Sequence, residues 1–134
     1  MSSFENVDLS KLKNEECYGG VDLSAVSDLT TVSAMFPPNP ERVYYPDKFI
    51  FKSWCFLPED TIEKSPNKEF YKKSINVNHL TKTPGNVVDY DYILKNLLDT
   101  NKDTPFNKIC YDQYNATQFA INANDAALPM EPYA

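Results

Sequence analysis

The chain has 134 residues, which suits one domain with a substantial core and is too short for two. Apolar residues make up 42%, with nine tyrosines and eight phenylalanines to fill a core, and this excludes an intrinsically disordered chain. The formal net charge of −6 argues against a domain that binds nucleic acid tightly by charge alone.

The apolar runs are too short to span a membrane, and the start, MSSFENVDLSKLKNEE, lacks the build of a secretory signal. We therefore expect no membrane segment and a cytoplasmic protein. Residues 1–16 are predicted to form a loose polar segment, with Leu9 and Leu12 as docking points.

The cysteines Cys17, Cys55 and Cys110 are widely spaced and odd in number, and His79 is the single histidine. This set does not provide the ligands of a zinc site. We expect reduced, buried thiols and a surface or structural role for His79.

The first half of the chain predicts three antiparallel strands in a row. Cys17–Leu23 and the β-branched run Leu29–Phe36 are close enough to pair as a hairpin. The proline-rich stretch PPNPERVYYPD is then a loop, and Phe49–Leu57 is the third strand.

The middle of the chain, residues 58–86, is the least regular part. NKEFYKKSI is predicted to form a short helix with Phe70 and Ile75 facing inward, and a Pro-Gly turn follows at Pro84–Gly85.

The stretch VVDYDYILKNLLDTN has the clearest helical period in the chain. Its expected buried face consists of Tyr90, Ile93, Leu94, Leu97 and Leu98. Asp89 and Asp91 lie in its first turn, where carboxylates suit the helix dipole.

A strand over Phe106–Asp112 and a second helix over NATQFAINANDAA follow. A further strand begins at LPMEPYA. We expect one face of the second helix to be buried, formed by Ala116, Phe119, Ala120 and Ala123.

Two aspartates, Asp22 and Asp112, each lie within or at the end of an apolar strand. An unpaired carboxylate in a buried strand is costly, so a compensating partner is expected. If the two strands run parallel and adjacent, about 4.8 Å apart, the carboxylates repel each other unless a divalent cation lies between them. Magnesium suits such oxygen ligands. The alternative from the residues alone is that Asp22 caps the Ser24–Ser27 turn and Asp112 caps the following helix.

Three stretches resemble one known family. CYGGVDLSAVSDLTTVSAMF is similar to the first hairpin of the nuclease domain in tailed-phage terminase large subunits. KICYDQYNATQFA is similar to that domain's fourth strand and following helix, and HLTKTPGNVVDYDYI to the stretch before its first long helix. The matches fall in the family's order and cover nearly all of Cys17–Tyr133.

The resemblance implies an α/β, ribonuclease H-like domain over residues 17–134: a mixed sheet with three antiparallel strands, then parallel ones, and flanking helices. Asp22 and Asp112 match the family's metal-binding, catalytic aspartates, which cut concatemeric DNA with two Mg²⁺ or Mn²⁺ ions. Asp28 falls in the matched hairpin and is expected to be structural or to support the site; Asp125 is a weaker candidate ligand. Tyr111, Gln113 and Asn115 flank Asp112 and could shape the site, Asn115 more plainly as a helix cap.

Two departures from the family matter. The chain has three glycines (Gly19, Gly20 and Gly85), so the phosphate loop of the family's packaging ATPase is absent. The family's third metal-binding aspartate lies beyond residue 134, so we expect a C-terminally incomplete domain with weak cleavage or none. Its exposed apolar surface would then favour self-association. For the full-length protein, the resemblance implies a phage or prophage origin, with double-stranded DNA, the small terminase subunit and the portal as partners in the bacterial cytoplasm.

The middle of the chain is its most basic region, and DNA phosphates are candidate ligands there. The lysines concerned are Lys64, Lys68, Lys72, Lys73 and Lys82. Interleaved Glu63 and Glu69 favour the alternative of an ordinary solvated surface. Two other readings of the whole chain remain open: a non-catalytic remnant or interaction module of the same fold, and a resolvase or integrase relative, which the quoted stretches match less well.

Overall fold

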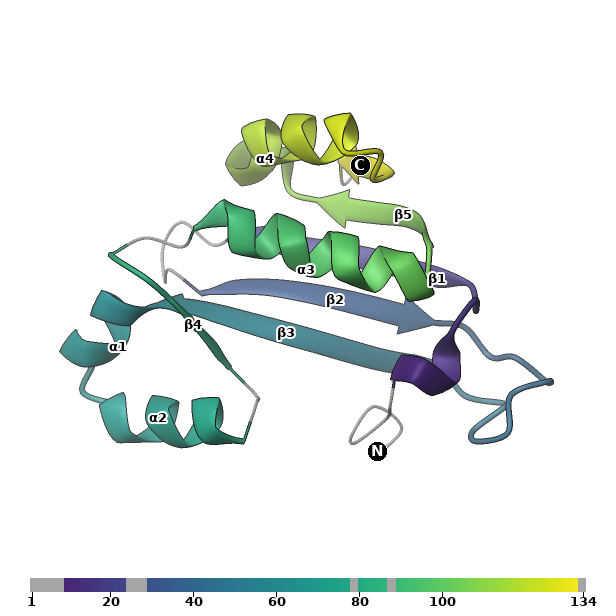
Figure 1. The fold of residues 1–134 in the computed structure, drawn as a ribbon, viewed down its shortest axis with the longest axis horizontal. Helices are drawn as coiled ribbons and strands as arrows, with labels where there is room; N and C mark the ends of the chain where they lie inside the picture. Colours follow the sequence, from purple (N-terminus) through teal and green to yellow (C-terminus); the bar gives the residue numbers. More distant parts are fainter. Residues whose placement is uncertain (1–8, 24–28, 78–79, 87–88, 133–134) are drawn as a thin grey trace.

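The computed structural model describes residues 9–23, 29–77, 80–86 and 89–132, and its centre is one six-stranded sheet (Figure 1). The strand order is β4-β3-β2-β1-β5-β6. The strands are β1 (Cys17–Leu23), β2 (Thr30–Phe36), β3 (Ile50–Pro58), β4 (Thr81–Thr83), β5 (Phe106–Tyr111) and β6 (Met130–Pro132). The helices are the 3-10 turn η1 (Leu9–Leu12), α1 (Glu59–Lys64), α2 (Lys68–Asn76), α3 (Tyr90–Asp103) and α4 (Gln113–Asp125).

The sheet is mixed, as the sequence predicted. Strands β1, β2 and β3 pair antiparallel, while β4 pairs parallel with β3, β5 parallel with β1, and β6 parallel with β5. Because β1 and β3 both run antiparallel to β2, the carboxyl ends of β1, β3 and β5 lie at the same end of the sheet.

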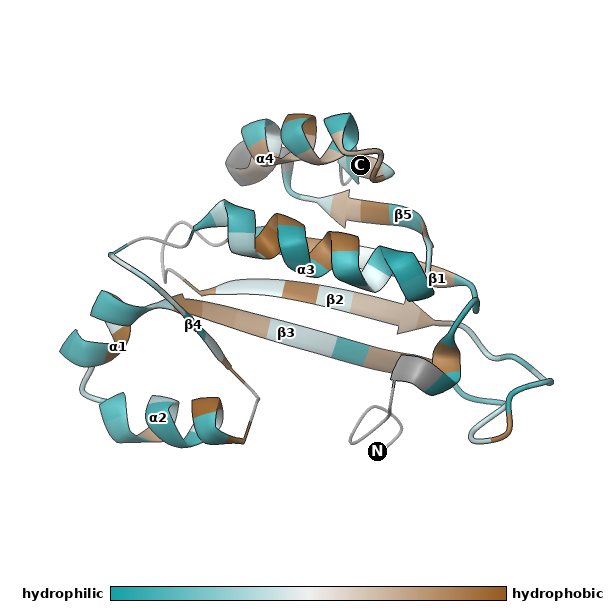
Figure 2. Ribbon diagram, in the orientation of Figure 1, coloured by the Kyte–Doolittle hydropathy of each residue, from teal (hydrophilic) through white to brown (hydrophobic). Residues whose placement is uncertain are grey.

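Side-chain alternation gives the sheet one apolar face, which helices α3 and α4 cover (Figures 1 and 2). In β2, every second residue is buried, from Thr30 to Phe36, and the residues between them are half-buried. The predicted faces of both helices contribute to this core, which includes Ile93 and Leu97 of α3. In α4 all four predicted residues are buried: Ala116, Phe119, Ala120 and Ala123.

The fully buried face of α3 contains fewer residues than the sequence predicted. Ile93 and Leu97 are fully buried, but Leu94 and Leu98 pack only partly against the core. Tyr90 is 46% exposed, and its ring makes an edge contact with Phe119 of α4 at a centroid distance of 6.0 Å.

A second, smaller cluster lies beneath α1 and α2, around Leu57, Ile62 and Leu80. Within α2, Tyr71 and Ile75 pack against it, whereas Phe70 is 67% exposed. The predicted inward position of Phe70 is therefore wrong. Residues four apart share a helix face, so burying Tyr71 with Ile75 turns the preceding residue about 100° away.

The segment before β1 is tied to the β2–β3 loop. Leu12 is 1% exposed and belongs to the main core, in agreement with its predicted docking role. Glu15 forms an ion pair with Arg42 at 2.6 Å, in which both side chains are nearly buried. Among the residues that the structure describes, no helix is long and apolar enough to cross a membrane.

Candidate active site

Asp22 and Asp112 each come one residue after a pair of residues that face each other on two adjacent parallel strands. Val21 of β1 pairs with Tyr111 of β5, and Asp22 and Asp112 come directly after these partners. The two strands are therefore parallel and adjacent, which is the condition that the sequence analysis set for a shared cation site. Neighbouring strands are about 4.8 Å apart, so the two residues lie side by side at one end of the sheet.

Asp22 is exposed, although it lies inside a strand between two buried residues. Val21 and Leu23 point into the apolar core, and alternation directs Asp22 to the opposite face, which α3 and α4 leave uncovered. The expected cost of a buried charge therefore does not arise. A carboxylate at this position is open to solvent and to a ligand.

Asp112 is half-buried and stands between β5 and α4. The N–H of Ala116 donates to the backbone carbonyl of Asp112 at 3.1 Å, which places Asp112 at the start of α4. The backbone is non-helical at Ala116 (φ −132°, ψ 16°), so only a short first turn follows Asp112 before α4 kinks. The capping alternative for Asp112 thus fits its backbone position and is compatible with a site role. The turn that Asp22 was proposed to cap lies outside the described residues.

The register also identifies neighbours that sequence reasoning missed. Thr31 of β2 is the cross-strand partner of Asp22, and Cys55 of β3 is the partner of Thr31. The hydroxyl of Thr31 lies 4.0 Å from the sulfur of Cys55. Counting residues outward from the hairpin turn would have found Thr31, but the position of Cys55 depends on how β3 pairs.

The structure explains why position 19, one of the two glycines before Asp22, has no side chain. A β-carbon at this position would lie 2.9 Å from the ring of Phe106 and 3.1 Å from Ile109, both on β5. The glycine therefore allows β5 side chains to pack closely over β1, the strand that carries Asp22.

The other acidic candidates are not brought to this place by the described structure. Asp28 lies outside the described residues. Asp125 is exposed at the last position of α4, the opposite end of that element from Asp112. In the part of the chain that is described, no three acidic, histidine or cysteine side chains gather as a metal-binding group.

The predicted DNA-contacting lysines lie at the same end of the sheet, because α1 and α2 follow directly from the carboxyl end of β3 (Figure 1). Lys68 and Lys72 both pair with Glu63, at 2.9 and 3.8 Å, and Lys82 pairs with Glu59 at 3.6 Å. The hydrogen bond from Lys68 lowers the pKa of Glu63, and the same bond raises the pKa of Lys68.

Lys64 and Lys73 differ from these three lysines: among the described residues, neither has an ion-pair partner within 4 Å. Exposed ion pairs contribute little free energy and exchange partners easily. The paired lysines therefore remain available to an external anion, and the solvated-surface alternative remains equally compatible with the geometry.

The family model described as "Terminase large subunit, endonuclease domain" matches residues 4–134. The crystal structure of the HK97 bacteriophage large terminase is similar, with a TM-score of 0.71 and 22% sequence identity. The match covers 90% of this chain and 25% of the HK97 chain, so the present chain spans a quarter of that protein's length. No curated protein matches.

Proposed function

Because the chain belongs to the family of terminase large subunit endonuclease domains, we propose that it is the DNA-cutting module of a phage genome-packaging enzyme and that Asp22 and Asp112 form its hydrolytic centre. The fold is the ribonuclease H-like mixed sheet shared with the HK97 large terminase. The observation that carries the site assignment is the parallel register, which sets Asp22 beside Asp112 at the carboxyl ends of β1 and β5.

The donor atoms at this position fit a hard divalent cation. Asp22 and Asp112 would hold Mg²⁺ or Mn²⁺ through carboxylate oxygens, the ligands such ions prefer. When bound, the metal supplies Lewis-acid stabilisation of the phosphate and an activated water for hydrolysis of a phosphodiester. Asp22 is exposed on the uncovered sheet face, so a DNA strand can approach it without displacing α3 or α4.

The lysines of α2 and β4 would bind the backbone of double-stranded DNA next to this centre. Phosphate contacts of this kind position the nucleic acid without reading its sequence. Lys73 is the strongest candidate, because its charge is not paired within the described structure. For the full-length packaging enzyme, we propose the small terminase subunit and the portal as partners, in the cytoplasm of the bacterial host.

A second candidate, a non-catalytic module of the same fold, is favoured by one observation. The register places Asp22 and Asp112 on adjacent strands, but among the described residues no group of three acidic, histidine or cysteine side chains forms. A domain that kept the sheet and lost the reaction would show this arrangement, together with the overall acidity of the chain.

Metal binding provides the first test. Manganese that binds the folded chain stabilises it by about 2.7 kcal/mol at 100 times the dissociation constant. We expect millimolar Mn²⁺ to raise the melting temperature of the wild-type chain and to leave that of Asp22→Asn unchanged. The matched control is Asp47→Asn, an exposed carboxylate in the β2–β3 loop at the other end of the sheet, which should keep the full shift.

DNA cleavage provides the second test, with supercoiled plasmid, Mn²⁺ and the same three proteins. Slow nicking that disappears in Asp22→Asn and persists in Asp47→Asn supports the nuclease. A metal-dependent melting shift without nicking favours the non-catalytic module. If neither the shift nor the nicking depends on Asp22, the proposed centre is wrong.

A further inference from the structure

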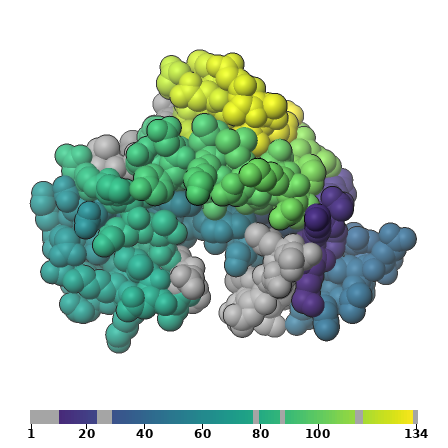
Figure 3. Space-filling model, in the orientation of Figure 1, coloured from purple at the N-terminus to yellow at the C-terminus, as the bar shows by residue number. Residues whose placement is uncertain are grey.

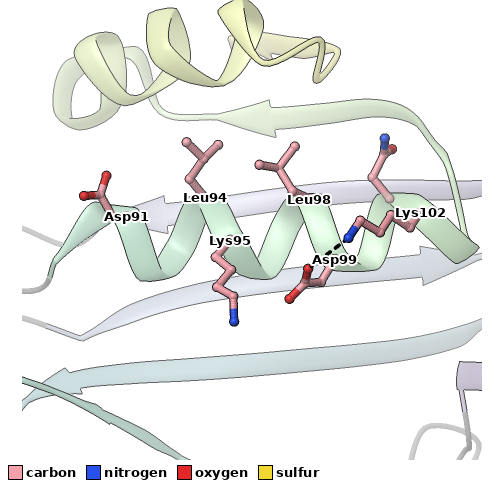
Figure 4. Close-up of a pocket in the computed structure, with 7 residues that line it drawn as sticks. Asp91, Leu94, Lys95, Leu98, Asp99 and Lys102 are labelled. Atoms are coloured by element: carbon pink, nitrogen blue, oxygen red, sulfur yellow. Dashed lines mark ion pairs between the residues drawn. The ribbon is translucent and has the colours of Figure 1, made fainter.

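A groove of about 480 Å³ runs along α3, lined by side chains of this helix (Figure 4). Its apolar part is formed by Leu94 and Leu98, which are half-buried and one helical turn apart. The helix lies on the apolar side of the sheet, whereas Asp22 is on the opposite face. The groove is therefore separate from the candidate active site.

The outer surface of α3 is accessible over most of its length. In the space-filling view, α3 forms the green band between the teal α1–α2 region and yellow α4 (Figure 3). The side chains of Lys102 and Asp99 are 79% and 57% exposed, and they form a loose pair at 3.9 Å. Within the described structure, no other element covers Leu94 and Leu98 fully.

The charges around the two leucines alternate in sign along the helix. Asp91 is followed by Lys95, then Asp99, then Lys102, all four lining the groove. A second α3 laid antiparallel across the groove would place its Lys102 near Asp91 and its Asp99 near Lys95. Leu94 of each copy would then face Leu98 of the other. A parallel copy in register would oppose like charges.

This pattern is complementary to itself, which is the requirement for a two-fold symmetric contact. We propose that α3 is a self-association surface, through which two copies of this chain pair with antiparallel α3 helices. The leucines supply the apolar contact, and the alternating charges select the antiparallel orientation.

The expected dimer is weak. A helix of 14 residues is about 21 Å long, and a contact along it buries less than the roughly 800 Å² per partner of a standard stable interface. The exposed ion pairs add little affinity individually. We therefore expect a concentration-dependent equilibrium between monomer and dimer rather than a permanent dimer.

Sedimentation equilibrium of the full chain between about 10 µM and 1 mM tests the proposal, since weak complexes of small interfaces populate this range. The weight-average mass should rise from 15.3 kDa toward twice that value. Lys95→Glu and Asp99→Lys, tested singly, each oppose like charges in the symmetric dimer and should weaken it about tenfold or more. Lys13→Glu, an equal charge reversal in an exposed turn, should leave the equilibrium unchanged.

Mixing the two single variants gives the decisive result. In the mixed dimer, the glutamate introduced into one copy faces the lysine introduced into the other. The unchanged Asp99 of the first copy faces the unchanged Lys95 of the second, so every pair is again of opposite sign. We expect the mixture to associate as well as the wild-type chain, while each variant alone stays largely monomeric. Circular dichroism verifies that both variants fold.

Three outcomes would overturn the proposal. The first is a wild-type chain that is monomeric at 1 mM, which would leave the groove for a different protein. The second is a dimer that the single variants do not weaken, which would place the contact elsewhere. The third is failure of the mixture to recover association. None of these readouts depends on nuclease activity, so this proposal and the proposed function stand or fall separately.

Discussion

Replacing Arg42 with methionine should strongly destabilise the fold. Arg42 is 8% exposed and organises the β2–β3 loop. Its guanidinium donates to both carboxylate oxygens of Glu15, with distances of 2.6 to 3.1 Å. It also donates to three loop carbonyls, those of Pro37 at 2.7 Å, Tyr45 at 2.9 Å and Lys48 at 3.0 Å.

The expected loss of stability follows from the groups that lose their partner when Arg42 is replaced. Methionine preserves much of the apolar stem, so the loss is mainly electrostatic. The Glu15 side chain is only 10% exposed and would be left without its counter-charge. Removing one partner of a buried pair costs about 3–5 kcal/mol. Arg42→Lys keeps the charge but loses the fork of donors, so we expect an intermediate loss.

Urea unfolding followed by the fluorescence of Trp54, the single tryptophan, measures this loss. Trp54 lies on β3 and packs against the core, so it reports global unfolding. The double variant Arg42→Met/Glu15→Gln removes both charges and should be more stable than the sum of the single losses predicts, by about 1 kcal/mol or more. A single loss below about 1 kcal/mol, or strict additivity in the double variant, would refute the view that this pair holds the loop.

Three further predictions concern other parts of the fold. Ala127→Gly should stabilise the chain by about 1 kcal/mol. Ala127 lies two residues beyond the end of α4 and has a φ of 70°, which glycine adopts without strain. Thermal melting measures the change, and a lower melting temperature would contradict the prediction. Gly19→Ala should lower the free energy of unfolding by about 1–3 kcal/mol, because the new methyl group would clash with the Phe106 ring. Adding Phe106→Leu to this variant should recover part of the loss. If Gly19→Ala were as stable as the wild type, the ring would have to move aside without cost. Burial raises the pKa of the Cys17 thiol to about 12. Below about pH 9 the thiol is neutral in both the folded and the unfolded chain, so it does not make stability depend on pH. Between about pH 9 and 12 only the unfolded chain ionises it, which lowers the free energy of unfolding by about 1.4 kcal/mol per pH unit. Thiol titration at pH 8 should accordingly label Cys17 only on unfolding, and rapid native labelling of all three cysteines would count against it.

Local patterns predicted most of the secondary structure. Both long helices bury only one side, and this leaves a helical period of apolar residues in the sequence. That period predicted Ile93 and Leu97 as buried residues of α3, and it predicted the small apolar face of α4. The β-branched run of β2 and its closeness to β1 identified the hairpin.

Elements without such a pattern were missed. Strand β4 has three residues, Thr81–Thr83, and its extended form is set by pairing with the edge of β3. Phe70 was placed inward because it is apolar, but the cluster under α2 selects Tyr71 and Ile75. Arg42, a charged residue in a proline-rich loop, gave no sign that it would be buried, since its partner Glu15 lies 27 positions away in the chain.

The sequence alone determined that Asp22 lies inside an apolar strand with Val21 and Leu23 as neighbours, whereas its exposure on the opposite face was seen only in the structure. It also placed Asp112 between a strand and a helix. Only the tertiary structure decided that β5 lies beside β1 rather than at another edge, and hence that Asp22 and Asp112 follow paired positions on adjacent strands. That choice depends on long-range packing: the apolar faces of α3 and α4 must cover the same side of the sheet, and Gly19 must admit the ring of Phe106.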